Sequence, residues 1–245
     1  MQQRAPQAFS VAFSTSVGNF SVRVTRSKGP LGADRFYNLV TNHFYDGARF
    51  YRVLPDSKRY AIAQFGVNGN PNISYVYNYL NNAPDAILPD EPMVPGVSNV
   101  RGSVSWSASY TADEMATNRT AELFVNLHNN TKLDSHGFAP FGVIDPEGME
   151  VVDQFFAGYG EMPDVCRMTG RPVSECHGPE EARLYSEGER YGTRCFLSVV
   201  GFSTASLYSL YSLLYPFSLL SFAFNSNTTH SRFANTATSA SPSPS

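Results

Sequence analysis

Charged side chains, cysteine and tryptophan are scarce in this sequence, and each shortage excludes something. Charged residues make up 16 % of the chain, against about a quarter in a typical soluble domain. No basic cluster suggests a nucleic-acid partner. Every Asp and Glu precedes Gly192, so the end of the chain is almost uncharged. With one Trp and three Cys, the chain has too few cysteines for a disulfide scaffold.

The cysteines allow one bridge at most between near neighbours. Cys166 and Cys176 lie in a polar stretch, at a spacing that suits a loop-closing disulfide if the compartment is oxidising. A metal site would draw on these two and His177, but no fourth ligand is near and the spacing matches no known pattern, so we expect no metal. Residues 1–8 are polar and do not resemble a signal peptide, which leaves the compartment open.

Phenylalanine and tyrosine are plentiful, with 18 and 14 copies, and 245 residues suffice for one sizeable domain and a tail. Alternating apolar residues over Phe9–Ser14 and again over Phe20–Val24 predict a β-hairpin. Pro30 is well placed to open a helix. On this helix we expect an inward face of Leu31, Phe36, Leu39 and Val40, with Asp34, Arg35 and Asn38 pointing outward.

Later segments continue a mainly β pattern. Strands are expected within Ser103–Ser109, Glu122–Leu127 and Phe138–Ile144. Residues Pro71–Pro95 are rich in Asn and Pro and predict a long surface loop. A second helix carries Pro146, Met149, Val152 and Phe156 and ends at Gly158.

The stretch Arg49–Pro55 (RFYRVLP) has the alternation of a half-buried strand and carries Arg52 among bulky apolar side chains. An arginine in such surroundings needs hydrogen-bond acceptors, and its planar fork can hold a polar group in one orientation. From the pattern alone, we favour an arginine that lies over a barrel wall or pairs with a carboxylate.

Several ordered blocks closely resemble the cyclophilin-type peptidyl-prolyl isomerases. The blocks are Gly32–Val40, His43–Gly47, Arg49–Pro55, Gln64–Gly66, Gly102–Ser105, Glu122–Asn126, Leu133–Gly142 and Gly148–Asp153. The resemblance runs from about Phe9 to about Tyr191. It implies a cyclophilin-like closed antiparallel eight-stranded β-barrel capped by two α-helices. Residues 1–8 would be a short lead, 9–191 the domain, and 192–245 a tail.

The closing strand is uncertain, because Arg183–Gly188 resembles the family's entry to its last strand and the resemblance then stops. From Cys195 to Phe224 no residue is charged, which is long enough to span a bilayer, although serines and Pro216 make a poor span. A membrane anchor, a replaced closing strand with a disordered tail, and sequence never selected to fold remain alternatives. We favour the last two.

The resemblance implies an isomerase that acts on X–Pro bonds in protein folding. Arg52 takes the position of the family's catalytic arginine and Gln64 that of the glutamine that orients substrate and arginine. Phe124 matches the floor of the proline pocket and Leu133 a wall beside it. Such a monomer would bind proline-containing peptides or unfolded proteins, and it would need no cofactor and no nucleic acid. Each of these side chains also suits ordinary barrel packing.

Departures from the family pattern favour a second hypothesis, a proline-peptide binding or chaperone module with weak or lost catalysis. Ala61 stands where a pocket aromatic is usual, and Tyr60 or Ile62 could replace that aromatic only if the longer Asp56–Ala63 segment aligns differently. Glu122 replaces a common glutamine and, as an acceptor-only carboxylate, could bind Arg52 in competition with substrate.

The rim of the pocket departs from the family as well. Phe138 replaces a frequent histidine or tyrosine there. Lys132 replaces a tryptophan that contacts cyclosporin-type ligands in many members, so we do not expect strong sensitivity to those drugs.

Overall fold

The computed structural model describes residues 3–57, 59–77, 86–188, 190–191 and 202–208. The predicted hairpin is confirmed: β1 (Ala8–Thr15) and β2 (Gly18–Thr25) pair antiparallel from Ala8 opposite Thr25 to Thr15 opposite Gly18. A two-residue connection therefore joins the strands, as expected for a tight hairpin.

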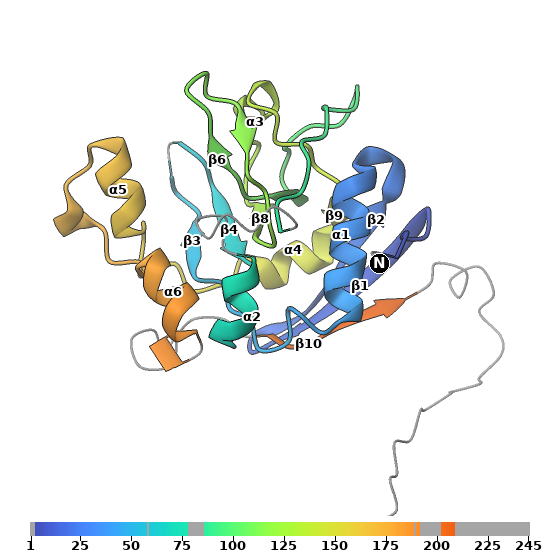
Figure 1. The fold of residues 1–245 in the computed structure, drawn as a ribbon, viewed down its shortest axis with the longest axis horizontal. Helices are drawn as coiled ribbons and strands as arrows, with labels where there is room; N and C mark the ends of the chain where they lie inside the picture. The colour runs from blue at the N-terminus through green and yellow to red at the C-terminus, as the bar shows by residue number, and fades with distance from the viewer. Residues whose placement is uncertain (1–2, 58, 78–85, 189, 192–201, 209–245) are drawn as a thin grey trace, which may run out of the picture. The chain divides into compact units, whose positions relative to one another are not determined.

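One large antiparallel sheet organises the fold (Figure 1). Its eight strands follow the order β10-β1-β2-β9-β5-β8-β4-β3. Besides β1 and β2 they are β3 (Arg52–Leu54), β4 (Ile62–Phe65), β5 (Ser103–Trp106), β8 (Leu123–Asn126), β9 (Gly142–Ile144) and β10 (Phe202–Tyr208). A separate two-stranded sheet joins β6 (Ser109–Tyr110) to β7 (Ala116–Thr117).

The predicted closure of the barrel is not found. Within the described residues, no strand pairing connects β3 to β10, the two ends of the strand order. β10 pairs with β1, and it lies beyond residue 191, inside the segment assigned above to the tail. The compact unit that contains the sheet extends to Tyr211. The other residues of the uncharged Cys195–Phe224 stretch lie outside the described part of the chain. In that described part, no helix has the length and apolar character to cross a bilayer.

The two faces of the sheet have different side chains. On β4 and β8, Ala63, Phe65, Leu123 and Val125 point into the main hydrophobic core, where all are almost fully buried. Aromatic rings dominate this core, and Phe50 and Phe65 pack with centroids 4.7 Å apart. Because side chains alternate along a strand, the residues between these positions lie on the opposite face.

The helices are more numerous than predicted. The two expected helices are α1 (Pro30–Thr41) and α4 (Pro146–Val152), and α4 packs on β2. The chain also forms α2 (Pro71–Val76), α3 (Lys132–Ser135), α5 (Pro163–Thr169) and α6 (Glu181–Glu187), together with 3-10 turns at Arg26–Lys28 and Val173–Glu175. The expected entry to a last strand at Arg183–Gly188 is therefore wrong, since α6 occupies it and contacts α2.

The α1 helix buries three of the four predicted residues, Phe36, Leu39 and Val40, and the prediction fails only at Leu31 and Arg35. Leu31 is exposed, whereas Arg35 is 4 % exposed and donates from Nη1 to the carbonyls of Ala86 and Thr120. Those two carbonyls accept from Nη1 and offset part of the cost of burying the guanidinium. The Pro71–Pro95 segment is likewise more than a surface loop, because it begins as α2 and its Glu91 accepts from the backbone N–H groups of the first turn of α1.

The α4 helix begins where predicted and ends earlier. The Asp145 side chain accepts from the N–H of Gly148 and caps the start. The helix stops at Val152, so Phe156, which was expected to belong to it, lies beyond its end and is exposed, whereas Phe155 is buried.

Candidate functional site

Three of the predicted site residues lie in one row across the sheet. Arg52 on β3 is directly opposite Gln64 on β4, and Gln64 is directly opposite Phe124 on β8. Directly opposed residues share a face, and this is the face away from the main core. The strand pairing thus brings these three residues together, although Arg52 and Phe124 are 72 positions apart in the sequence.

The Arg52 guanidinium is held by two side chains. Its Nη1 donates to Gln64 Oε1 at 2.9 Å. Its Nε and Nη2 donate to the two carboxylate oxygens of Glu161, at 2.7 and 2.9 Å. This arrangement is the bidentate pairing that fixes the plane of a guanidinium. The Arg52 side chain keeps 15 % of its surface exposed.

Glu161 was not found from the sequence. It is separated from Arg52 by 109 positions and belongs to no recognised motif. A single acidic residue between Gly160 and Met162 looks like an ordinary loop residue, so no local signal pointed to it.

Glu122 does not bind Arg52, contrary to the competition considered above: the structure shows no hydrogen bond between them. It accepts instead from the hydroxyls of Tyr51 and Tyr185, and from Gln64 Nε2 at 2.8 Å. Burial, with the nearby Glu122 charge, raises the pKa of Tyr51 well above its ordinary value, so its hydroxyl remains a donor. Gln64 therefore links Glu122 to Arg52, through its amide nitrogen and its amide oxygen respectively.

The predicted pocket residues form one apolar cluster, on the same face as Arg52. It consists of the predicted residues Ile62, Phe124, Leu133 and Phe138, together with Ala116, which was not predicted. The Phe124 and Phe138 rings are 5.8 Å apart and edge-on. All five side chains are 5 % exposed or less, and the partly buried Leu54, Tyr60 and Ala108 pack against them. We call this group the outer cluster.

Ala61 stands where the family has a pocket aromatic. Because side chains alternate between the two faces, Ala61 and its neighbours Tyr60 and Ile62 point to opposite sides. Ala61 is buried in the main core, while Ile62 is part of the outer cluster and Tyr60 packs against it. Lys132, the first residue of α3, is exposed.

A cavity of about 310 Å³ lies elsewhere, between Val53, Leu127 and Phe155. It is lined by none of the predicted site residues. Val53 follows Arg52 in β3 and points to the opposite face, so this hollow does not extend the Arg52 row.

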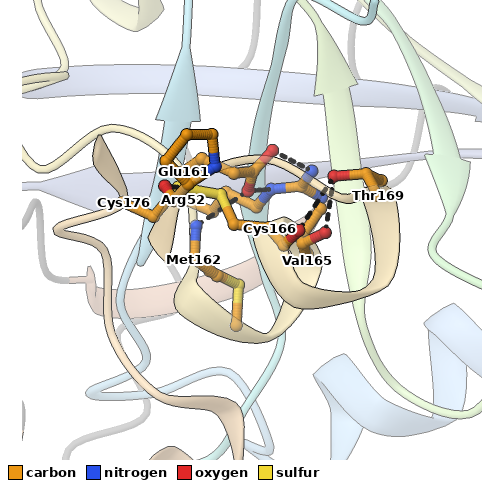
Figure 2. The surroundings of a disulfide bond; sticks show 8 residues. Arg52, Glu161, Met162, Val165, Cys166, Thr169 and Cys176 are labelled. Carbon is orange, nitrogen blue, oxygen red and sulfur yellow. Dashed lines mark hydrogen bonds and ion pairs between the residues drawn. A yellow bond between two sulfur atoms is a disulfide. The ribbon is translucent and has the colours of Figure 1, made fainter. Parts of the chain in front are cut away.

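The chain after α4 covers the Arg52 end of the row. Met162, Leu184, Tyr185 and Tyr191 from this segment pack with Tyr51 and Val67 in a second small apolar cluster. Cys166 and Cys176 form a disulfide beside Arg52 and Glu161 (Figure 2). Burial, with the negative charges of Glu122 and Asp164, raises the pKa of Glu181 in α6 to about 7. Among the described residues, no group of His, Cys, Asp and Glu is arranged to hold a metal ion.

Sequence similarity to known proteins identifies the family of this chain. Residues 10–173 match the family model for cyclophilin type peptidyl-prolyl cis-trans isomerases. The chain belongs to this family. This cyclophilin is 28 % identical over 148 residues to a peptidyl-prolyl cis-trans isomerase of Acinetobacter baylyi, covering 59 % of the present chain and 70 % of the relative. It is 30 % identical over 148 residues to peptidyl-prolyl cis-trans isomerase A of Dickeya dadantii, covering 59 % of this chain and 69 % of that one.

Solved structures support the same fold. A Cryptosporidium parvum cyclophilin type peptidyl-prolyl cis-trans isomerase superposes with a TM-score of 0.53 at 14 % identity, covering 82 % of this cyclophilin and 98 % of that chain. The same parasite protein, crystallised in the presence of the dipeptide Ala-Pro, superposes with a TM-score of 0.51 at 14 % identity, covering 82 % and 99 %. At this identity the likeness establishes a cyclophilin-like fold.

Proposed function

We propose that this cyclophilin catalyses cis–trans isomerisation of X–Pro bonds in proline-containing peptides and unfolded proteins, with Arg52 as the catalytic residue. The observation that carries the proposal is the row Arg52–Gln64–Phe124, in which a fixed guanidinium and the apolar outer cluster share one face of the sheet. Family membership supports the same reaction class.

The chemistry needs few parts. Amide resonance gives rotation a barrier of about 18–20 kcal/mol, and no bond has to be broken. A catalyst must bind the twisted amide more tightly than either planar form. In the twisted form the prolyl nitrogen regains its lone pair and accepts a hydrogen bond. A guanidinium aimed at that nitrogen stabilises the transition state selectively, and dry surroundings strengthen the contact.

The remaining residues have assigned roles in this proposal. Gln64 orients Arg52 through the 2.9 Å hydrogen bond to Nη1. The proline ring binds against the outer cluster, with Phe124 as the floor, Ile62 and Leu133 as walls, and Phe138 at the rim. Leu54, Tyr60 and Ala108 pack against these residues. Glu122 accepts a hydrogen bond from Gln64 Nε2 and so holds the Gln64 amide in place.

A binding or chaperone module without useful catalysis is the second candidate. It is favoured by the buried state of the outer cluster and by the ion pair that occupies Arg52. The Ala-Pro dipeptide used with the Cryptosporidium parvum relative supports proline-peptide binding under either candidate.

The test compares Arg52→Ala with Arg23→Ala, a control at an exposed arginine on β2. Isomerisation of an Ala-Pro peptide is measured by NMR exchange, and binding by titration. Removal of one preorganised donor typically costs about 10²–10³ in rate, so we expect Arg52→Ala to lose that much of kcat/KM and Arg23→Ala to stay within about twofold. Wild-type rates equal to the uncatalysed background, with binding retained, would instead establish the binding module.

A further inference from the structure

Glu161 and Gln64 together fix the orientation of the Arg52 guanidinium. A guanidinium carries five N–H donors. Glu161 accepts one from Nε and one from Nη2, and Gln64 accepts one from Nη1. One N–H on each of the two Nη nitrogens lies outside these bonds. The pairing therefore immobilises the guanidinium and still leaves donors for a substrate.

Glu161 is itself rigidly held. It is 7 % exposed, and its Oε1 also accepts from the N–H of Met162 at 2.8 Å. Its carbonyl oxygen accepts from the N–H of Gly178 at 2.9 Å. A Cβ at position 178 would lie 2.8 Å from that oxygen, so the close approach requires glycine. Met162, just before α5, and Gly178, after it, thus both anchor Glu161.

The disulfide closes the segment between those two anchors. Cys166 lies in α5, a helix that begins directly after Met162. The N–H of Cys166 donates to the Met162 carbonyl at 3.1 Å. Its partner Cys176 comes shortly before Gly178. A cross-link across a loop restricts the conformations available to it. Figure 2 shows the bridge beside the Arg52–Glu161 pair.

We propose that Glu161 is a positioning residue for Arg52, and that the Cys166–Cys176 disulfide holds Glu161 in place. This inference rests on the proposed isomerase function. Arginine has a long flexible stem, and a contact that exists only in the transition state depends on how accurately the guanidinium is aimed. Glu161 supplies that aim from a segment remote in sequence, and the redox state of the disulfide sets how firmly it does so.

The first experiment uses Glu161→Gln, Glu161→Asp and the control Glu175→Gln, which changes an exposed carboxylate inside the same disulfide loop. All proteins also carry Cys195→Ser, so that only one disulfide pairing is possible. We measure kcat/KM and the Kd of an Ala-Pro peptide by NMR, and check folding by near-ultraviolet circular dichroism.

The amide of Glu161→Gln keeps one acceptor and turns a donor toward Arg52. We expect about a tenfold loss of kcat/KM, with the Kd within about twofold. Glu161→Asp keeps both carboxylate oxygens and should lose less, and Glu175→Gln should match the parent. A kcat/KM that is unchanged or higher in folded Glu161→Gln overturns the inference, a rise meaning that the carboxylate competes with substrate. If Glu161→Gln overturns the inference but Arg52→Ala is inactive, the proposed isomerase function is still supported.

The second experiment reduces the disulfide with dithiothreitol. Two electrons and two protons pass from the dithiol to the bridge, giving the free thiols of Cys166 and Cys176 and the cyclic disulfide of the reagent. Alkylation and mass spectrometry verify complete reduction. We expect reduction to lower the activity of the parent severalfold. The already lowered activity of Glu161→Gln should not fall further on reduction. No loss in the parent, or an equal loss in both backgrounds, overturns the role assigned to the disulfide.

Discussion

The buried carboxylate of Glu122 offers a quantitative test of what attaches α6 to the sheet. Tyr185 in α6 donates its hydroxyl to Glu122 on the β8 side, and Tyr51 donates to the other carboxylate oxygen. Glu122 and both tyrosines are less than a tenth exposed. Tyr185→Phe removes one donor without changing the shape of the ring, so the oxygen loses its partner inside the protein.

The expected magnitude follows from the charge of the acceptor. Hydrogen bonds to charged groups contribute about 1.5–3 kcal/mol. With a urea m-value of about 2 kcal/mol/M, Tyr185→Phe should lower the unfolding midpoint by about 0.7–1.5 M. The control is Tyr37→Phe, whose half-buried ring keeps its edge-on contact with Phe9 and should shift the midpoint by about 0.2 M or less.

The assay is urea unfolding at neutral pH followed by circular dichroism, with the disulfide intact. A Tyr185→Phe shift no larger than the Tyr37→Phe shift would refute the reasoning. The double variant Tyr51→Phe/Tyr185→Phe adds a second criterion. Because both hydroxyls serve one carboxylate, their effects should not be additive, and strict additivity would mean that the two contacts are independent.

Two further predictions concern pH and backbone geometry. The pKa of Glu181 is raised to about 7, so between its unfolded value and pH 7 the folded state binds more protons, and stability should fall as pH rises through this window. Glu181→Gln should lose that fall, and urea midpoints at pH 5 and pH 8 measure it. Gly66 has a φ of 120° and a Cβ there would lie 2.5 Å from the Ala121 carbonyl oxygen; Gly66→Ala should lower the Tm by about 5–10 °C. Gly47→Ala, at φ 71° with open space around the Cβ, should lower it by less than half as much, and equal losses would contradict the clash.

Local signals predicted the parts of the fold that local forces determine. The β1–β2 hairpin has alternation and a tight turn, and α1 begins at Pro30 as expected. The burial of Arg35 was not predictable in the same way. Its acceptors are the carbonyls of Ala86 and Thr120, 51 and 85 positions away, and a helical pattern contains no information about them.

The site was predictable to the extent that it follows strand alternation. The motif blocks give the order of the segments that carry Arg52, Gln64 and Phe124. The pairing register of the strands then places these residues in one row. The surroundings were not predictable. Glu122 pairs with tyrosines rather than with Arg52, because Tyr185 arrives on a helix where a strand was expected.

The two-faced sheet has a consequence for how such a chain diverges. Residues that face the main core and residues of the Arg52 row alternate along the same strands, so substitutions at neighbouring positions perturb different parts of the structure. Replacing Ile62 or Phe138 changes the outer cluster, while Ala61, Ala63 and Phe65 keep the main core filled. The outer cluster can thereby be altered one residue at a time while the main core and the architecture are retained.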